Sequence, residues 1–337
     1  MEHRSLMSPV LLTATVLACA CGSGEVEGAR ATSEGSSGDP RTQGEVEIGE
    51  PTVDAGITEP PGAGDPSDRP WSHNTGPNDL GALVASGDID VTTNGALIEN
   101  VDVTGNIDIE ADNVTLRNFR VDCDGSLYGV RVRDGADNVT VQDGEIWNCD
   151  SAGVYAKGTN GLFTKLYVHD MESDGLKTDG DGNTVSWSYL TRLGAGEGSH
   201  ADGNQSVSGT NNTFEYNNFY MPKSGTPGHD NEPATSDPTY LYPGPPWRSN
   251  ATFIMHSGTS AIIRNNWLTG GNYTIYGNPG TTVRNNIFGR ENADHPSLSS
   301  CTNCNGSSRL CNGPFDDWSG NVWEDNGTEA GNNSSCD

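Results

Sequence analysis

The nine residues NVTVQDGEI, from Asn138 to Ile146, are one copy of a short motif that returns along this 337-residue chain. The copies begin at Gly95, Asn113, Asn138, Asn160, Gly182, Asn211, Ser260 and Gly280. Successive starts are 18, 25, 22, 22, 29, 49 and 20 residues apart. Most of these separations are typical of solenoid repeats, and the separation of 49 residues indicates an insertion, which we place at residues 221–250.

Two positions of the motif are apolar in copy after copy. The fourth position is occupied by Leu116, Val141, Phe163, Val185, Phe214, Ile263 and Val283. The ninth is occupied by Val121, Ile146, Val168, Leu190, Phe219, Leu268 and Phe288. Short β-rich pieces separated by Gly, Asn and Asp, at a period too short for a βαβ unit, indicate coils of strands and turns. Stacking such coils about 4.8 Å apart turns both columns into a continuous core.

A second predicted strand precedes later copies of the motif. These strands read YGVRV from Tyr128, AGVYA from Ala152, DGLKT from Asp174, DGNQS from Asp202, TFIMH from Thr252 and YTIYG from Tyr273. Two or more strands per coil, repeated along the chain, predict an all-β fold, a right-handed parallel β-helix.

Several further motifs resemble one group of proteins. NTGPNDL, SDGLK, GSHADGNQ, GGNYTIYG, TTVRNNIFGR and SGNVW are similar to sequences of bacterial right-handed β-helix repeat proteins of the pectate-lyase-like superfamily. The resemblance covers roughly residues 71–327 and implies a single-stranded right-handed parallel β-helix. That superfamily includes lyases, hydrolases, epimerases and non-enzymatic adhesins, so the resemblance leaves the reaction open.

The N-terminus reads as an export signal. Residues 1–20 have a basic start and an apolar run from Val10 to Ala20, which is too short to span a bilayer. Small residues before a cysteine resemble a lipoprotein signal, with Cys21, or else Cys19, as the lipidated residue. We therefore expect an exported lipoprotein of the outer membrane or cell surface, and a secreted protein is the alternative.

The composition predicts an acidic linker and restricts the partners. Residues 21–70 are rich in Gly, Ser, Pro and acidic residues, so we expect a disordered acidic linker. The chain has 18 basic and 46 acidic residues, a formal net charge of −28. This charge argues against nucleic acid or an anionic membrane surface as partner. We expect a monomer that contacts a membrane only through its N-terminal lipid anchor.

Six cysteines follow Cys21, an even number that suits disulfides in an oxidising compartment. Cys123 and Cys149 are 26 residues apart, about one coil, which predicts a disulfide between adjacent coils. The other four lie in a cystine-rich C-terminal segment, residues 296–337, and are Cys301, Cys304, Cys311 and Cys336. Two disulfides are favoured there over a zinc site.

Alternation of side chains along the second strands predicts an outward-facing ladder. Its members on successive coils are Arg131, Tyr155, Lys177 and Gln205. Asp174 and Asp202 occupy equivalent corners just before this ladder. Fixed donors beside carboxylates, repeated along a solenoid, suit an extended polysaccharide.

Two loops are expected to flank the same surface. One runs from Leu193 to Ala201 and includes His200, and the other is the insertion, which carries three aromatic residues. Those rings, Tyr240, Tyr242 and Trp247, are candidates for stacking on sugars, although they equally fit a role in packing the loop down.

The residue types of the ladder suit β-elimination on a uronic-acid polymer. Lys177 is the candidate base, provided that desolvation or the nearby Arg131 favours its neutral form. Tyr155 or His200 is the candidate acid, and Arg131 is the candidate for neutralising the substrate carboxylate. Calcium bound through Asp174 and Asp202 is a further candidate for that neutralising role.

Two other functions fit the same residues. An inverting glycoside hydrolase would use Asp174 and Asp202 as its acid and base. A glycan-binding adhesin would use the ladder without turnover, because charges on a solenoid face are usually only solvated. His169 shows no partner pattern in the sequence, so we interpret it as a structural or surface residue.

Overall fold

The computed structural model describes residues 69–221, 249–256, 258–271, 273–289 and 315–331. Within these ranges the regular elements are β-strands joined by turns, apart from a short 3₁₀ helix at Leu80–Ala82. No helix of the described residues is long and apolar enough to cross a membrane.

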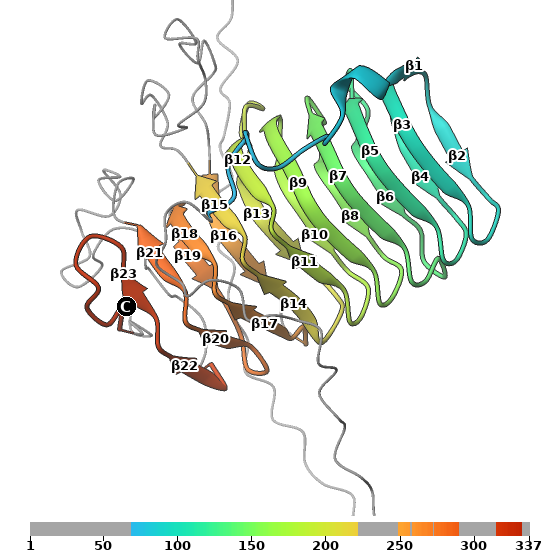
Figure 1. Ribbon diagram of the computed structural model, residues 1–337. Helices are drawn as coiled ribbons and strands as arrows, with labels where there is room; N and C mark the ends of the chain where they lie inside the picture. Colours follow the sequence, from blue (N-terminus) through green and yellow to red (C-terminus); the bar gives the residue numbers. More distant parts are fainter. Residues whose placement is uncertain (1–68, 222–248, 257, 272, 290–314, 332–337) are drawn as a thin grey trace, which may run out of the picture. The chain divides into compact units, whose positions relative to one another are not determined.

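The strands form two sheets whose strand pairs are all parallel (Figure 1). The eight-stranded sheet consists of β2 (Ile89–Val91), β4 (Ile107–Ile109), β6 (Tyr128–Val132), β8 (Ala152–Ala156), β10 (Asp174–Thr178), β13 (Ala201–Ser206), β16 (Ser249–Met255) and β19 (Tyr273–Tyr276). Along the chain, its strands alternate with those of a fifteen-stranded sheet, and each strand pairs with its equivalent on the next coil. This is the predicted right-handed parallel β-helix.

The fifteen-stranded sheet changes character midway. Its first strands are β1 (Val84–Ser86), β3 (Leu97–Thr104), β5 (Thr115–Asp122), β7 (Thr140–Trp147) and β9 (Leu162–Met171). After β9 each coil contributes two short strands: β11 (Thr184–Ser186) and β12 (Tyr189–Leu193), β14 (Asn212–Glu215) and β15 (Asn218–Met221), β17 (Ala261–Arg264) and β18 (Trp267–Gly270), β20 (Thr282–Arg284) and β21 (Ile287–Gly289), and β22 (Asp317–Ser319) and β23 (Val322–Trp323). The dividing residue has a left-handed backbone, as at Trp187 with φ of 50°.

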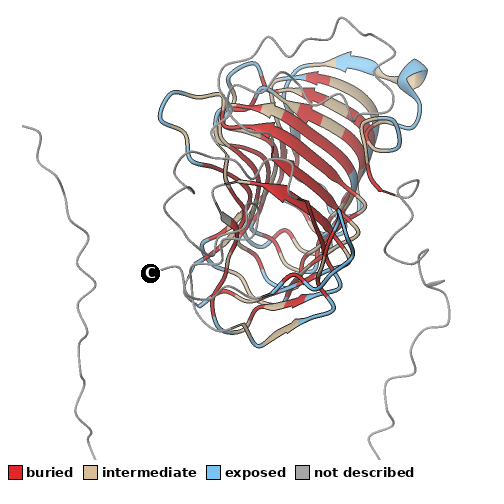
Figure 2. Cartoon of the chain, turned by 90° about the vertical axis from the view of Figure 1, so that its left-hand side faces the viewer, coloured by how far each residue is buried: buried red, intermediate tan, exposed pale blue. Residues whose placement is uncertain are grey.

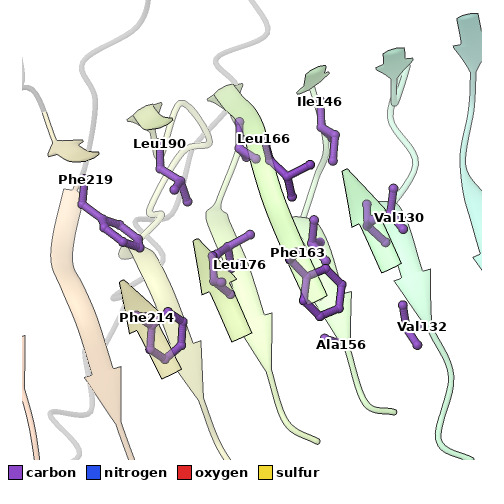
Figure 3. Close-up of a cluster of buried hydrophobic side chains, with 14 of the residues drawn as sticks. Val130, Val132, Ile146, Ala156, Phe163, Leu166, Leu176, Leu190, Phe214 and Phe219 are labelled. Carbon is purple, nitrogen blue, oxygen red and sulfur yellow. The ribbon is translucent and has the colours of Figure 1, made fainter. Parts of the chain in front are cut away.

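The two predicted apolar columns are confirmed as the core. Val141 pairs with Phe163 and Ile146 with Val168 in the register of β7 and β9, and the other members follow the same register. All fourteen predicted column residues are at most 1% exposed. Figure 3 shows members of both columns pointing into the interior, and Figure 2 shows the buried strands. The sheets therefore enclose one continuous apolar stack.

A ladder of buried asparagines closes the bend between the paired short strands. Asn217, Asn266, Asn286 and Asn321 occupy it on successive coils and are at most 1% exposed. The Asn266 side chain accepts from the Asn217 backbone N–H at 2.9 Å and donates to the Phe214 carbonyl at 2.9 Å. Because backbone groups buried at a bend need partners, the side chains here replace the missing ladder bonds.

Asn266→Ala is expected to lower the free energy of unfolding by about 3 kcal/mol, because it leaves a buried N–H and a buried carbonyl unpaired. Urea unfolding followed by circular dichroism measures the loss. Asn94→Ala is the matched control, since exposed Asn94 also accepts from a backbone N–H one coil away, that of Asp112. Equal losses of unfolding free energy in the two variants would contradict the role of buried Asn266 as the partner of these backbone groups.

The predicted disulfide between adjacent coils is present. Cys123 and Cys149 are bonded, with Cα atoms 4.9 Å apart, and both are fully buried. The four C-terminal cysteines (Cys301, Cys304, Cys311 and Cys336) and the candidate lipidation sites, Cys21 and Cys19, lie outside the described residues.

Residues 69–79 form a strap across the outer face of the fifteen-stranded sheet. Arg69 donates to Asn218 at 3.0 Å and pairs with Glu324 at 2.7 Å. The Trp71 ring packs on Tyr189, with centroids 5.4 Å apart. The strap contains Arg69 and Pro70, which the sequence analysis assigns to the linker and which are buried here. It therefore ties coils together on the sheet opposite the predicted ladder.

Candidate functional site

The four ladder residues lie in one column on the outer face of the eight-stranded sheet. Arg131 pairs with Tyr155, Tyr155 with Lys177, and Lys177 with Gln205 in the registers of β6, β8, β10 and β13. Each is half-buried, whereas its neighbours in the strand are buried. We call this column the outer track. Its placement matches the prediction from side-chain alternation.

The Asp-Gly pair that begins β10 has a packing reason. A Cβ atom on Gly175 would lie 2.7 Å from Leu190 Cδ2 and 2.8 Å from the Gly203 carbonyl oxygen of the next coil. Only glycine fits where the two coils approach so closely. The same holds one coil later, where a Cβ atom on Gly203 would lie 2.6 Å from the Thr252 carbonyl oxygen.

Asp174 connects the outer track to a buried pair of carboxyl groups. Its Oδ2 lies 3.2 Å from the Lys177 ammonium, and its Oδ1 accepts from the Asp202 backbone N–H at 2.8 Å. Asp202 in turn accepts from the Asn250 amide at 3.0 Å. Asp174 is 3% exposed and Asp202 is 1% exposed, so both lie beneath the surface that Lys177 presents.

Burial controls the protonation of this pair. Burial and the neighbouring Asp174 charge raise the pKa of Asp202 to about 8. Burial also raises the pKa of Asp174, against the effect of the Lys177 ammonium. At neutral pH Asp202 is therefore mostly protonated, and the Asp174 carboxylate balances Lys177. Asp174, Asp202 and Lys177 together therefore carry little net charge. This matters because burying an unpaired ion costs much free energy.

Arg131 is held at the other end of the track by an aspartate from the preceding coil. Its Nη2 lies 2.8 Å from Oδ2 of Asp108, and the same carboxylate accepts from Arg133 Nε at 2.7 Å. Asp108 is 5% exposed, and one carboxylate thus fixes two guanidinium groups. Arg131 faces Lys177 across the coil of Tyr155. The charge paired with Lys177 is that of Asp174, and Arg131 lies two coils away, as the ladder predicts.

Tyr155 is an oriented, protonated phenol. Its hydroxyl donates to Asp179 at 3.1 Å, and its ring packs at a tilt of 38° against Tyr128, with centroids 4.8 Å apart. Burial and the Asp179 carboxylate raise the pKa of Tyr155 to about 12. The phenol therefore keeps its proton at neutral pH, which suits a donor and not a base.

His200 is not brought into this network. His200 is exposed before β13, and its loop is closed by the Ser199 N–H donating to the Gly196 carbonyl at 3.1 Å. Among the described residues its ring has no hydrogen bond or ion pair. Tyr240, Tyr242 and Trp247 lie outside the described residues.

The donor set at Asp174 and Asp202 does not suit calcium. Calcium takes about six to eight oxygen ligands, and an ammonium group already lies beside Asp174. In the part of the chain that the structure describes, no group of three or more His, Cys, Asp or Glu side chains is arranged to hold a metal ion. We therefore derive no chemical step through a metal.

The acidic residues that pair with the side chains of the outer track were not predicted from the sequence. Asp108 lies on β4 and Asp179 follows β10, and neither belongs to the predicted ladder. The alternation in GNIDIE, from Gly105, is the signal that points to β4. Asn250 carries no such signal, because its place beside Asp202 depends on where the chain returns after the insertion.

A second polar cluster lies on the fifteen-stranded sheet, close to the strap. His169 contacts Asp170 at 2.6 Å and Glu145 at 3.1 Å, and Arg192 donates to Asp170 at 2.8 Å. Although burial acts in the opposite direction, hydrogen bonds from His169 and Arg192 hold the pKa of Asp170 well below its usual range. His169 therefore does have partners, two carboxylates, which the sequence pattern does not reveal.

Comparison with known proteins gives structural likeness alone. No known family profile matches the sequence, and no curated protein matches it. An alginate lyase from Paenibacillus sp. str. FPU-7 is similar over 73% of this chain and 80% of its own, with 12% identity and a TM-score of 0.42. Pectate lyase Pel9A is similar over 63% and 64%, with 16% identity and a TM-score of 0.38. PfbA, a surface adhesin of Streptococcus pneumoniae, is similar over 73% and 72%, with 10% identity and a TM-score of 0.40. Identities this low assign no activity to this chain.

Proposed function

We propose that the outer track binds an acidic polysaccharide and cleaves it by β-elimination. The observation that carries the proposal is the single column of Arg131, Tyr155 and Lys177 on consecutive coils. β-Elimination needs a cation for the substrate carboxylate, a proton donor and a base, and these three side chains supply one of each.

In this proposal Arg131 neutralises the uronate carboxylate, and Lys177 removes the C5 proton. The C5–H and C4–O bonds break, a C4–C5 double bond forms, and Tyr155 protonates the leaving oxygen. Lys177 must first lose a proton, and the Asp174 carboxylate, 3.2 Å from its ammonium, is the group placed to accept it. Asp108 and Asp179 orient Arg131 and Tyr155.

Hydrolysis by Asp174 and Asp202 has less support. Both carboxyl groups are buried, and their oxygens accept from the protein's own donors, those of Asp202 and Asn250. An inverting pair must instead hold a water and the glycosidic bond between its carboxyl groups.

Glycan binding without turnover is the second candidate. One observation favours it: Arg131, Tyr155 and Lys177 each have a carboxylate partner, so they are fixed donors for a bound polymer. An exported, lipid-anchored location stays a prediction, because residues 1–21 lie outside the described residues.

Incubation of the full chain with alginate, polygalacturonate and a glycosaminoglycan tests these functions. Ultraviolet absorbance from unsaturated ends is expected with one of them. New reducing ends without absorbance would indicate hydrolysis, and binding without either product would indicate an adhesin. Each incubation is repeated with EDTA and with added calcium. We expect equal rates, because Lys177 and Arg131 supply the positive charge.

A further inference from the structure

Lys157 is a cation beside the outer track. It is exposed, and its ammonium lies 5.8 Å from the centre of the Tyr155 ring. Among the described residues no carboxylate lies within ion-pair distance of it, whereas Arg131, Arg133 and Lys177 are all paired. On a chain with a net charge of −28, an unpaired lysine near three other cations is unusual.

The strand register places Lys157 next to Arg133. Val132 pairs with Ala156, and Arg133 and Lys157 are the residues that follow each of them. Both residues lie two positions beyond a member of the outer track, so their side chains leave the same face of the sheet. Arg133 keeps 42% of its side chain exposed while it binds Asp108. The two side chains thus form a second cationic row parallel to Arg131 and Tyr155.

Acidic residues lie on both sides of this cationic row. Asp90 and Glu110 are exposed acidic residues on the coils before Arg133, and Asp179 follows Lys177 on the coil after Lys157. Glu110 lies 3.8 Å from the Arg133 guanidinium. A polyanion is therefore attracted to the cations of β6, β8 and β10 and repelled by the carboxylates on either side of them. Three coils span about 10 Å at a spacing of ~4.8 Å, which limits the attraction to a short run of sugar units.

We infer that Lys157, together with Arg133, forms a second anion site that binds a carboxylate of the polymer next to the sugar held by Arg131. The inference rests on the proposed polysaccharide partner but not on turnover. Lys157 is a specificity residue in this scheme: it selects chains with negative charge on neighbouring units and takes no part in the bond-breaking step.

Lys157→Gln tests the site, with Lys165→Gln as the matched control. Lys165 is also an exposed lysine without a carboxylate partner among the described residues, but it belongs to β9 of the fifteen-stranded sheet. Binding of polygalacturonate, alginate and neutral dextran is measured by calorimetry at low and high salt. We expect Lys157→Gln to weaken binding of one acidic polymer about fivefold at low salt, and less at high salt. Dextran binding and the melting temperature are expected to stay unchanged.

The outcomes separate this inference from the proposed reaction. Acidic-polymer binding that depends on Lys157 but yields no unsaturated product supports the second site and overturns β-elimination. Unsaturated product with equal affinity for the wild type and Lys157→Gln overturns the second site alone. Equal weakening by Lys165→Gln would show a general charge effect and overturn it too, as would the absence of binding to any acidic polymer.

Discussion

Lys177→Met is expected to lower the turnover of the acidic polysaccharide by a factor of about 10² to 10⁴, the usual contribution of a positioned base. Methionine keeps the length and apolar stem of lysine but cannot accept the C5 proton. The loss should fall mainly on kcat, because Arg131 still binds the substrate carboxylate. Initial rates of unsaturated-end formation across a substrate series measure kcat and KM separately.

The folding of this variant needs its own control, because Lys177→Met leaves the Asp174 carboxylate buried without its cation. The double variant Lys177→Met with Asp174→Asn removes that charge and is expected to regain thermal stability while staying inactive. Recovery of activity in the double variant would show that Lys177 is not the base. Lys165→Gln should keep wild-type rates.

The fold was predictable because its signal repeats. Each coil contributes an apolar residue to the same two columns, so a random apolar match in one copy cannot imitate the pattern. The division of the strands after β9 was not predictable from this period. A left-handed residue occupies this position whether or not the strand is divided, since Lys165 within β9 and Trp187 between β11 and β12 both have a positive φ.

The outer track was predictable for the same reason, since alternation alone assigns Arg131, Tyr155 and Lys177 to one face. The carboxylates that pair with these side chains were not predictable. Asp108 reaches Arg131 from 23 residues earlier, and Asp179 reaches Tyr155 from 24 residues later. Contacts between coils depend on the register of stacking, which single-sequence periodicity gives only to within a residue or two. A shift of one residue would direct every one of these side chains to the other face.

The partners of His169 show the same limit. Trp147 and Tyr167 stack on its ring, with centroids 6.0 Å and 4.0 Å away, and Glu145 reaches it from the preceding coil. Trp147 and Glu145 belong to the preceding coil and leave no local sequence motif beside His169, although the residues form a compact cluster in the folded chain.

Asp202→Asn is expected to change how stability depends on pH. The folded protein holds a proton on Asp202 up to about pH 8, whereas the unfolded chain releases it near pH 4. Unfolding therefore releases a proton between these pH values, and the stability that Asp202 contributes falls as pH rises through them. In the middle of the window the slope approaches about 1.4 kcal/mol per pH unit. Asparagine stays neutral, so this part of the slope is lost in the variant, which should be the more stable protein above pH 8.

Urea unfolding at intervals from pH 2 to pH 9 measures the difference, and Asp170→Asn is the control, with an expected effect of opposite sign at the acid end of this range. Hydrogen bonds from His169 and Arg192 outweigh burial and depress the pKa of Asp170, so its contribution is present at neutral pH and is lost as pH falls below about 4. A parallel pair of curves for the wild type and Asp202→Asn would mean that Asp202 is ionised in the folded protein. The buried pair would then carry two negative charges against the single Lys177.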